Sequence, residues 1–430
     1  MSLAPGSRNP ESRSQSRHFF SESALASAYC FVVVFVSLRQ PLLWILETTQ
    51  WLESARWERS AYLNIASVMS YCPAIVLALK RLRPLKPFTV ALAAFLTWTI
   101  ATSVVNSVPD AQAHDLVIVI ATLLAYIGLS ELIGIDRLLS AVFAATQAGI
   151  ALSAVIVLTG GGITYRHGSW TGAFGNKNHL GFVCGLSALA GAHLAVRNFR
   201  TRRWNRLIMV TLIIGFSLWV LFLKTDNASG PAGLLVASAG GALAIASRGY
   251  LRKRNTRLDN KLVAGVFLPA YALAVLAGAV IGRELLTGLV GRSPTFTGRT
   301  TFWAEGLKGT LQRPISGWGW WTAHDNPDFT GLFERYSGFT THSFWVQTAL
   351  GSGIPGFVLT LITITVGLFA LSRAFFRGQF AALPAVAIPF YTLVFLSAED
   401  VRSQYAMSLA LLTLLMFEAA RNTSESITVA

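Results

Sequence analysis

The chain has 430 residues, of which 53% are hydrophobic and only 13% are charged. Soluble globular domains carry about 25% charged residues, so this composition excludes an ordinary soluble enzyme. The formal net charge of +15 would suit a nucleic-acid-binding protein, but the basic residues cluster in alternate loops between apolar segments, which favours a membrane protein.

Apolar segments long enough to cross a bilayer recur along the whole chain. A membrane-spanning helix needs about 20 mostly apolar residues. The pattern predicts an all-α polytopic membrane protein with about twelve transmembrane helices. The predicted spans are 24–46, 61–79, 88–105, 114–130, 137–158, 179–196, 207–223, 231–247, 262–281, 342–370, 380–397 and 403–419.

The alternation of basic loops predicts the topology. Because Lys and Arg gather in cytoplasmic loops, both termini are expected in the cytoplasm. The organisation predicted from this rule is a disordered cytoplasmic tail (1–20), transmembrane helices 1–9 (21–282), a large periplasmic loop with short amphipathic helices (283–341), transmembrane helices 10–12 (342–420) and a cytoplasmic tail (421–430).

The outer loop at 159–178 is rich in glycine and in hydrogen-bond donors. Arg166, Lys177 and Asn178 supply donors, and the loop itself contains no carboxylate. Since Arg pairs with phosphate oxygens and helix N-termini favour anions, the loop is a candidate cradle for a diphosphate. The alternative is an ordinary glycine-rich loop with helix caps.

The next outer loop contains Lys224 and Asp226. These two side chains either pair with each other, or Lys224 extends its charge to the membrane interface.

Within the large loop, residues 300–312 are predicted to form an amphipathic helix on the bilayer surface. Phe302, Trp303, Gly306, Leu307 and Leu311 would lie near one face of it. Arg313 follows, as a further candidate ligand for a diphosphate.

The large loop is also rich in tryptophan. Trp303, Trp318 and Trp320 either belong to an interfacial aromatic belt or form platforms on which sugar rings stack. His342 lies where the loop re-enters the membrane, and ionisable groups at that depth are functional candidates. The residues alone leave open whether His342 is functional or a packing residue.

Three stretches together resemble the O-antigen ligase/polymerase (Wzy-C) family, closest to its exopolysaccharide-polymerising branch. Residues 168–181 are similar to the branch signature Gly-Ser-Trp-x-Gly-x-Phe-x-x-Lys-Asn-x-x-Gly. Residues 297–319, with Thr-Gly-Arg-Thr, Arg-Pro and Gly-Trp-Gly, resemble the start of the family's periplasmic loop. Residues 342–356, with His-Ser-Phe and a glycine-rich end, resemble the terminal His-Asn motif.

The resemblance implies a bacterial inner-membrane glycosyltransferase. Family members move glycans from undecaprenyl diphosphate to an acceptor hydroxyl at the periplasmic face. Arg299 and His342 match residues on which the family relies. Ser343 stands where Asn is usual, and Ser229-Gly230 stands where many ligases have Ser-Arg.

The missing arginine leaves one phosphate contact unassigned, and Lys224, Lys177 and Arg166 are the candidates to replace it. No cofactor is expected. Fixed guanidinium groups stabilise a departing diphosphate without a metal, and imidazole suits the general base that takes the acceptor proton.

The expected function is therefore polymerisation of exopolysaccharide or O-antigen repeats. The partners implied are the lipid-linked donor, a saccharide acceptor, the bilayer and other polysaccharide assembly proteins, with no nucleic acid. One alternative is an O-antigen ligase that transfers finished chains to lipid A core or another terminal acceptor. An alternative of another class is a transporter of polysaccharide or lipid-linked oligosaccharide, since about twelve spans is a common transporter count.

Overall fold

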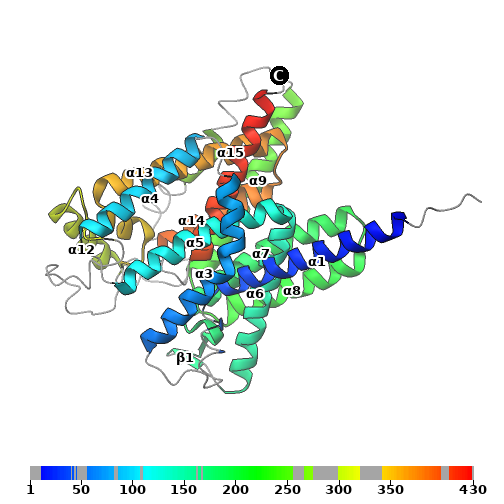
Figure 1. Cartoon of the computed structure of the whole chain (residues 1–430), viewed down its shortest axis with the longest axis horizontal. Helices are drawn as coiled ribbons and strands as arrows, with labels where there is room; N and C mark the ends of the chain where they lie inside the picture. Colours follow the sequence, from blue (N-terminus) through cyan, green and yellow to red (C-terminus); the bar gives the residue numbers. More distant parts are fainter. Residues whose placement is uncertain are drawn as a thin grey trace, which may run out of the picture.

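The computed structural model is an elongated bundle of helices (Figure 1). The structure describes residues 11–39, 41–42, 45, 56–81, 86–106, 110–160, 163–165, 168–254, 266–274, 299–319, 341–398 and 406–428. The helices are α1 (Glu11–Ser37), α3 (Arg56–Arg81), α4 (Pro87–Val105), α5 (Asp110–Ile133), α6 (Ile135–Leu158), α7 (Lys177–Arg200), α8 (Trp204–Leu223), α9 (Ser229–Arg254), α12 (Arg299–Gln312), α13 (Phe344–Arg377), α14 (Ile388–Ala398) and α15 (Ala406–Thr428), with short turns η1 (Gly172–Phe174) and η4 (Leu383–Ala387).

The all-α polytopic fold predicted from the sequence is confirmed. Among the described residues, eight helices are long and apolar enough to cross a membrane, and shorter apolar helices occur at Ala24–Ser37 and Leu383–Ser397. Eight predicted spans coincide with the long helices, the first and eleventh with the shorter ones, and the twelfth with α15. The ninth predicted span, 262–281, is described only at 266–274, where the chain is helical.

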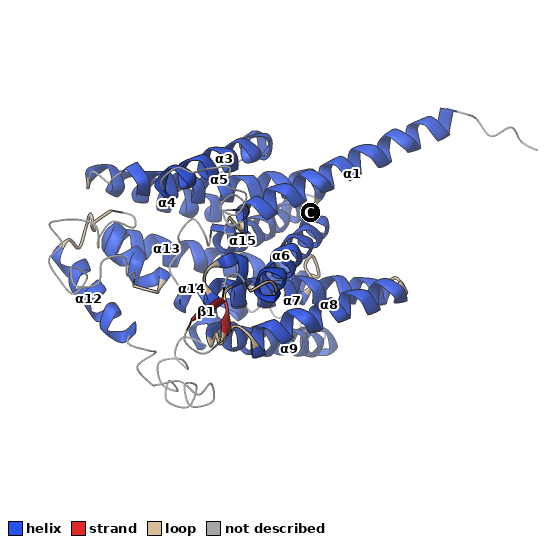
Figure 2. Ribbon diagram, turned by 90° about the horizontal axis from the view of Figure 1, so that it is seen from below, coloured by secondary structure: helices blue, strands red, loops and turns tan. Residues whose placement is uncertain are grey.

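The predicted terminal tails differ from the structure. Helix α1 begins at Glu11, so residues 11–20 are helical, and α15 continues to Thr428. Once an apolar segment has nucleated a helix, each further residue adds a backbone hydrogen bond, which extends the helix into polar sequence. The N-terminal end of α1 runs out beyond the bundle (Figure 2).

Helix α7 lies at the centre of the bundle and α8 at its edge. In their apolar windows, 72% of the residues of α7 are buried but only 22% of those of α8. Helix α14 packs against α7 and α9 through Tyr391, whose ring fits against Gly185 and Gly233. Small residues at these positions let the helices approach closely, which is the usual source of packing energy between membrane helices.

The predicted glycine-rich outer loop forms a hairpin that precedes the N-terminus of α7. Strands β1 (Ile163–Tyr165) and β2 (Ser169–Trp170) pair antiparallel and are followed by the turn η1. Gly172 has a φ of 52°, and a β-carbon there would collide with Ser153 of α6. Only glycine therefore allows η1 to lie this close to the end of α6.

Candidate active site

The tenth predicted span, 342–370, is not one continuous helix. Helix α13 is interrupted at Gly353, which has a φ of 68° and a ψ of −175°, and Pro355 follows two residues later. Pro lacks a backbone N–H, so the regular helical hydrogen bonds cannot continue through this point. Residues 344–352 form a short helix, and residues 354–377 form a longer one.

The loop after α12 supplies the hydrogen bonds that this break removes. The amide of Trp318 donates to the carbonyl of Leu350 (3.0 Å), and the amide of Gly319 donates to that of Gly351 (2.9 Å). In return, the amide of Ile354 donates to the carbonyl of Pro314 (2.8 Å). Backbone groups at membrane depth must be paired within the protein, and this loop pairs them.

Helix α12 is the amphipathic helix predicted at 300–312, although it buries a different face. Gly306, Gly309 and Thr310 are buried, whereas Leu307 and Leu311 are 52% and 72% exposed. The glycines allow α12 to press against the start of α13, and this close packing turns the two leucines outward. Exposed leucines on a surface helix suit contact with a bilayer.

The N-terminal half of α12 docks beside His342. The indole N–H of Trp303 donates to the carbonyl of Thr341 (2.9 Å). The ring of Phe302 meets that of His342 edge-on, with 6.4 Å between centroids. Arg299 precedes Phe302 and Trp303 by three and four residues, and positions so spaced share a helix face. The first turn of α12, which begins at Arg299, therefore lies near His342 through Phe302.

The backbone at His342 has an unusual conformation for a residue with a side chain. Its φ is 49°, in the left-handed region, where histidine is more common than most residues. Buried neighbours fix this conformation, because the hydroxyl of Thr341 lies 3.1 Å from both the Ser343 carbonyl and the Gln347 side-chain oxygen. Such conformations cluster at functional sites, where the surroundings hold them.

Arg313 and Trp318, two predicted substrate-binding residues, both make contacts within the protein. Arg313 donates to the side-chain oxygen of Asn106 (3.0 Å), at the end of α4, and its guanidinium lies 4.0 Å from the centre of the Trp318 ring. Trp318 is only 4% exposed, and its indole donates to the carbonyl of Gly309. A sugar ring therefore finds no open face of Trp318 to stack on. Trp303 likewise uses its indole N–H within the protein.

The cationic outer loops form a second cluster, and the structure shows which of their side chains pair. Lys177 makes an ion pair of 2.8 Å with Asp226, so a carboxylate from the next loop does balance the glycine-rich loop. Lys224 does not pair with Asp226. Its ammonium group lies 5.6 Å from the ring of Trp170 and 5.0 Å from that of Trp219, which are attractive cation–π positions.

Asn227 joins these loops, and sequence reasoning missed it. Its side-chain oxygen accepts from the amide of Ser229 (2.9 Å), and its amide group donates to the carbonyl of Asn178 (3.3 Å). An Asn side chain often bonds to the backbone amide two residues on, in an Asx turn, and an Asn just before a predicted helix could have identified this one. A β-carbon on Gly230 would come too close to the end of the Leu221 side chain, so a larger residue here would have to displace Leu221.

Helix α14 connects the two clusters. The indole of Trp345, at the start of α13, donates to the hydroxyl of Ser397 (2.8 Å). Six residues earlier on α14, about 9 Å along its axis, the hydroxyl of Tyr391 bonds near the start of α7, with the carbonyls of Gly181 and Phe182 at 3.2 and 3.1 Å. Both clusters therefore lie at the same end of the bundle, with α14 between them (Figures 1 and 2). Arg166 and Trp320 lie outside the described residues.

The fold and this site define a polytopic membrane protein with an interrupted helix, covered by an amphipathic helix and flanked by cationic loops. Residues 180–361 match the family model described as O-antigen ligase, Wzy_C, which confirms the resemblance seen in the motifs. The chain is also similar to the exopolysaccharide production protein ExoQ of Rhizobium meliloti (strain 1021), with 26% identity over 232 residues. That alignment covers 48% of this chain and 47% of the relative, so the chain spans about half of the relative's length.

Proposed function

We propose that this protein is a membrane glycosyltransferase that moves a glycan from undecaprenyl diphosphate to an acceptor hydroxyl at the periplasmic face of the bacterial inner membrane. The observation that carries the proposal is the docking of α12 beside His342, through the bond from Trp303 to Thr341, within the family-matched residues. The proposed topology has both termini in the cytoplasm, since Lys and Arg cluster in alternate loops of the sequence.

In the proposed reaction, the acceptor oxygen forms a bond to the anomeric carbon while the bond from that carbon to the diphosphate breaks. Negative charge grows on the departing diphosphate, and a fixed guanidinium such as Arg299 stabilises it. His342 takes the proton of the acceptor hydroxyl as general base. Attack from the face opposite the leaving group inverts the anomeric centre, and no metal is required.

The cationic loops are the second part of the proposed site. They are proposed to bind the phosphate of the donor that is bonded to the glycan, together with the first sugar. The residues assigned to this role are Lys177, Lys224, Asn178 and Arg166. Lys224 is the stronger candidate to replace the missing family arginine, because Lys177 already has Asp226 as a partner. Arg313, Trp303 and Trp318 are assigned instead to holding the fold of the site.

Polymerisation of exopolysaccharide repeats is the favoured form of the activity, because the similar protein is named for exopolysaccharide production. A ligase that attaches finished chains to a terminal acceptor is the second candidate, since the family model is described as O-antigen ligase. Both use the same donor chemistry, and they differ in the length of the chain transferred.

The experiment compares the lipid-linked glycan pools of cells that lack this protein and of cells that carry variants. For a polymerase, Arg299→Ala and His342→Ala should accumulate single lipid-linked repeats; for a ligase, they should accumulate long lipid-linked chains. Matched controls are Lys308→Ala, which removes an exposed cation from α12, and His193→Ala, at the opposite end of α7. Normal polymer in both site variants, at normal protein level, would refute the proposal.

A further inference from the structure

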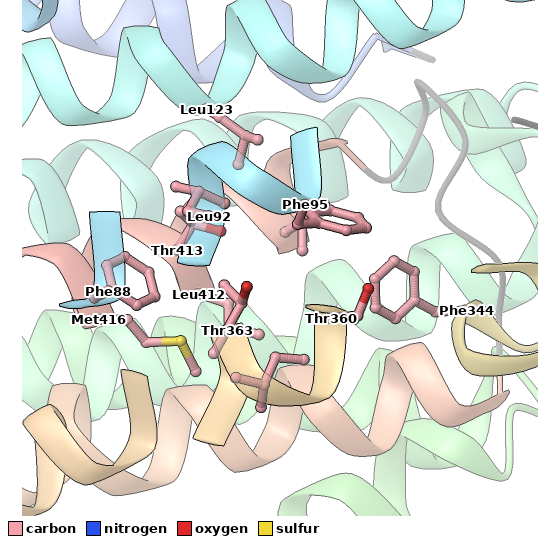
Figure 3. Close-up of a pocket in the computed structure, with 12 residues that line it drawn as sticks. Phe88, Leu92, Phe95, Leu123, Phe344, Thr360, Thr363, Leu412, Thr413 and Met416 are labelled. Carbon is pink, nitrogen blue, oxygen red and sulfur yellow. The ribbon is translucent and has the colours of Figure 1, made fainter. Parts of the chain in front are cut away.

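The apolar space between helices α4, α13 and α15 is too small for a lipid chain (Figure 3). Phe88, Phe344 and Met416 are among its lining residues, and it leaves a guest only about 30 Å³. That volume is too small even for one isoprene unit, so the space is a gap in the packing of the core. A lipid chain is better accommodated on a helix surface that faces the bilayer.

Helix α8 has such a surface, a stripe of apolar side chains along one face. Leu212, Phe216, Trp219 and Leu223 follow one another at intervals of three or four residues, which places them on the same side of the helix. All four side chains are exposed. This α8 stripe extends about 16 Å along the helix axis, which is roughly half of the hydrocarbon thickness of a bilayer.

Aromatic rings form the part of the α8 stripe near the C-terminal end of the helix. The ring of Phe216 stacks on that of Trp219, with 5.9 Å between centroids and 22° between planes. The ring of Trp219 also meets that of Trp170 edge-on, at 5.5 Å. By contrast, the large apolar side chains that α4 exposes are all aliphatic. Because aromatic rings offer a large and rigid apolar area, the stacked pair gives a lipid chain more contact than an aliphatic surface does.

A cation lies at this end of the α8 stripe. The ammonium group of Lys224 is 5.0 Å from the centre of the Trp219 ring and 5.6 Å from that of Trp170. The backbone is held as well, since the amide of Trp170 donates to the carbonyl of Lys224 (2.7 Å). A positive charge at the end of an apolar stripe complements a molecule with an anionic head and a hydrocarbon chain.

We propose that the α8 stripe binds the first isoprene units of the lipid donor, an inference that rests on the proposed function and on its assignment of Lys224 to the diphosphate. The chain is covalently bonded to the diphosphate, so its first units lie only a few bonds from the phosphate assigned to Lys224. Trp219 is the exposed apolar ring at that distance, and Phe216 lies one turn further into the bilayer. The chain then follows α8 towards Leu212.

The test measures binding to the purified full chain in phosphatidylcholine nanodiscs with two probes. Undecaprenyl diphosphate carries the charged group and the isoprene chain, whereas inorganic diphosphate carries the charged group alone. Phe216→Ala removes one ring of the stripe and leaves Trp219, which contacts Lys224, in place. Loss of one aromatic contact should weaken binding of undecaprenyl diphosphate roughly two- to tenfold and leave that of inorganic diphosphate within about twofold.

The matched control is Phe199→Ala, which removes an exposed ring at the opposite end of α8, where Phe199 contacts Trp204. It should leave binding of both probes within about twofold. Lys224→Gln removes the cation and should weaken binding of both probes, because both carry the diphosphate.

The failures of the two proposals are distinguishable. Unchanged binding of undecaprenyl diphosphate to Phe216→Ala overturns the stripe proposal, as does an equal loss for both probes or an equal loss in Phe199→Ala. Wild-type binding of both probes by Lys224→Gln overturns it too, because the stripe then has no link to the diphosphate. If the wild-type protein binds neither probe, the proposed function itself fails.

Photolabelling provides a second measurement that does not depend on a substitution. A polyprenyl diphosphate with a diazirine on its first isoprene unit should label the peptide of α8 that carries Phe216 and Trp219. Excess undecaprenyl diphosphate should suppress the labelling, and excess phosphatidylglycerol should not. Suppression by phosphatidylglycerol would assign the stripe to ordinary boundary lipid, and a changed oligomeric state of Phe216→Ala would assign it to contact between two copies of the chain. Either result overturns the proposal.

Discussion

Gly317 and Gly353 lie backbone against backbone, although they belong to different motifs of the sequence. A β-carbon on Gly317 would collide with the carbonyl of Gly351 and the amide of Gly353. One on Gly353 would collide with the carbonyls of Pro314 and Ile315. Both glycines have positive φ values, 61° and 68°. The backbone of the Gly-Trp-Gly motif (317–319) therefore packs directly against the glycine-rich end of the His motif (351–353). This backbone contact is called the interlock below.

Gly353→Ala should loosen this interlock. The substitution places a side chain in a left-handed conformation and against two carbonyl groups, so we expect a loss of about 2 kcal/mol or more in stability. Glycosyl transfer should fall with it, because His342 lies two residues before the start of α13. Thermal unfolding in detergent and transfer activity are the measurements.

The matched control for that substitution is Gly215→Ala in α8, where a β-carbon meets nothing within 4 Å. Alanine favours a helix over glycine, so this variant should unfold at the same temperature as wild type or slightly higher. A Gly353→Ala protein with wild-type unfolding and activity would show that the interlock is not required.

Arg313 and Asn106 should behave as one unit in a double-mutant cycle. Their hydrogen bond of 3.0 Å connects the end of α4 to the loop after α12, whose backbone hydrogen-bonds to the interrupted part of α13. Since a bond to a charged donor contributes about 1.5–3 kcal/mol, Arg313→Ala and Asn106→Ala should each destabilise the protein, and the double variant should cost clearly less than their sum. The free energy of unfolding in mixed micelles measures this coupling.

The same pair distinguishes a structural arginine from a phosphate ligand. If Arg313 acts only through the fold, Arg313→Ala and Asn106→Ala should reduce activity to a similar extent and leave the KM for the donor within about twofold. A large rise in KM for Arg313→Ala alone would restore the interpretation that it binds the diphosphate. Additive free energies would likewise argue against the structural role.

The spans were predictable from sequence because each follows from local apolar composition. Eight predicted spans coincide with long apolar helices. The span 342–370 was predicted as one helix because Gly353 and Pro355 are common enough in membrane helices to be read through. The break is revealed only by its partners, Pro314 and Trp318, which hydrogen-bond to it from another part of the chain.

The candidate site was predictable in its residue types and not in its pairings. Arg299 and His342 stand out as charged or ionisable groups in a loop at a membrane face. Charge alone could not show that Lys177 pairs with Asp226, because they are 49 residues apart. Charge alone also could not show that the guanidinium of Arg313 stacks on the buried ring of Trp318.

Asp226→Asn should release Lys177 for the donor. The ion pair of 2.8 Å is exposed and contributes about 1 kcal/mol or less to folding, so stability should change little. Asp226 has a φ of 45°, which Asn tolerates equally well. If Lys177 contacts the diphosphate, the variant should bind undecaprenyl diphosphate about two- to fivefold more tightly, and Lys177→Gln should bind it more weakly.

The control for this charge change is Glu305→Gln, which removes the partner of Lys308 on α12. It alters the net charge by the same amount at the outer end of the bundle and should leave donor binding unchanged. Equal tightening in both variants would mean that overall charge, and not Lys177, determines affinity. No change in either would remove Lys177 from the proposed cradle.

Trp303→Phe should show whether Trp303 positions His342, the candidate base, or only stabilises the fold. The substitution keeps an aromatic ring against α13 and removes the indole N–H that donates to Thr341, the residue before His342. A neutral hydrogen bond contributes about 0.5–1.5 kcal/mol, so kcat should fall roughly two- to tenfold while the unfolding temperature changes little. Trp204→Phe, at the exposed start of α8, is the control. Because the bond acts through His342, adding Trp303→Phe to His342→Ala should cause no further loss of activity, whereas full additivity of the two effects would show that Trp303 acts elsewhere.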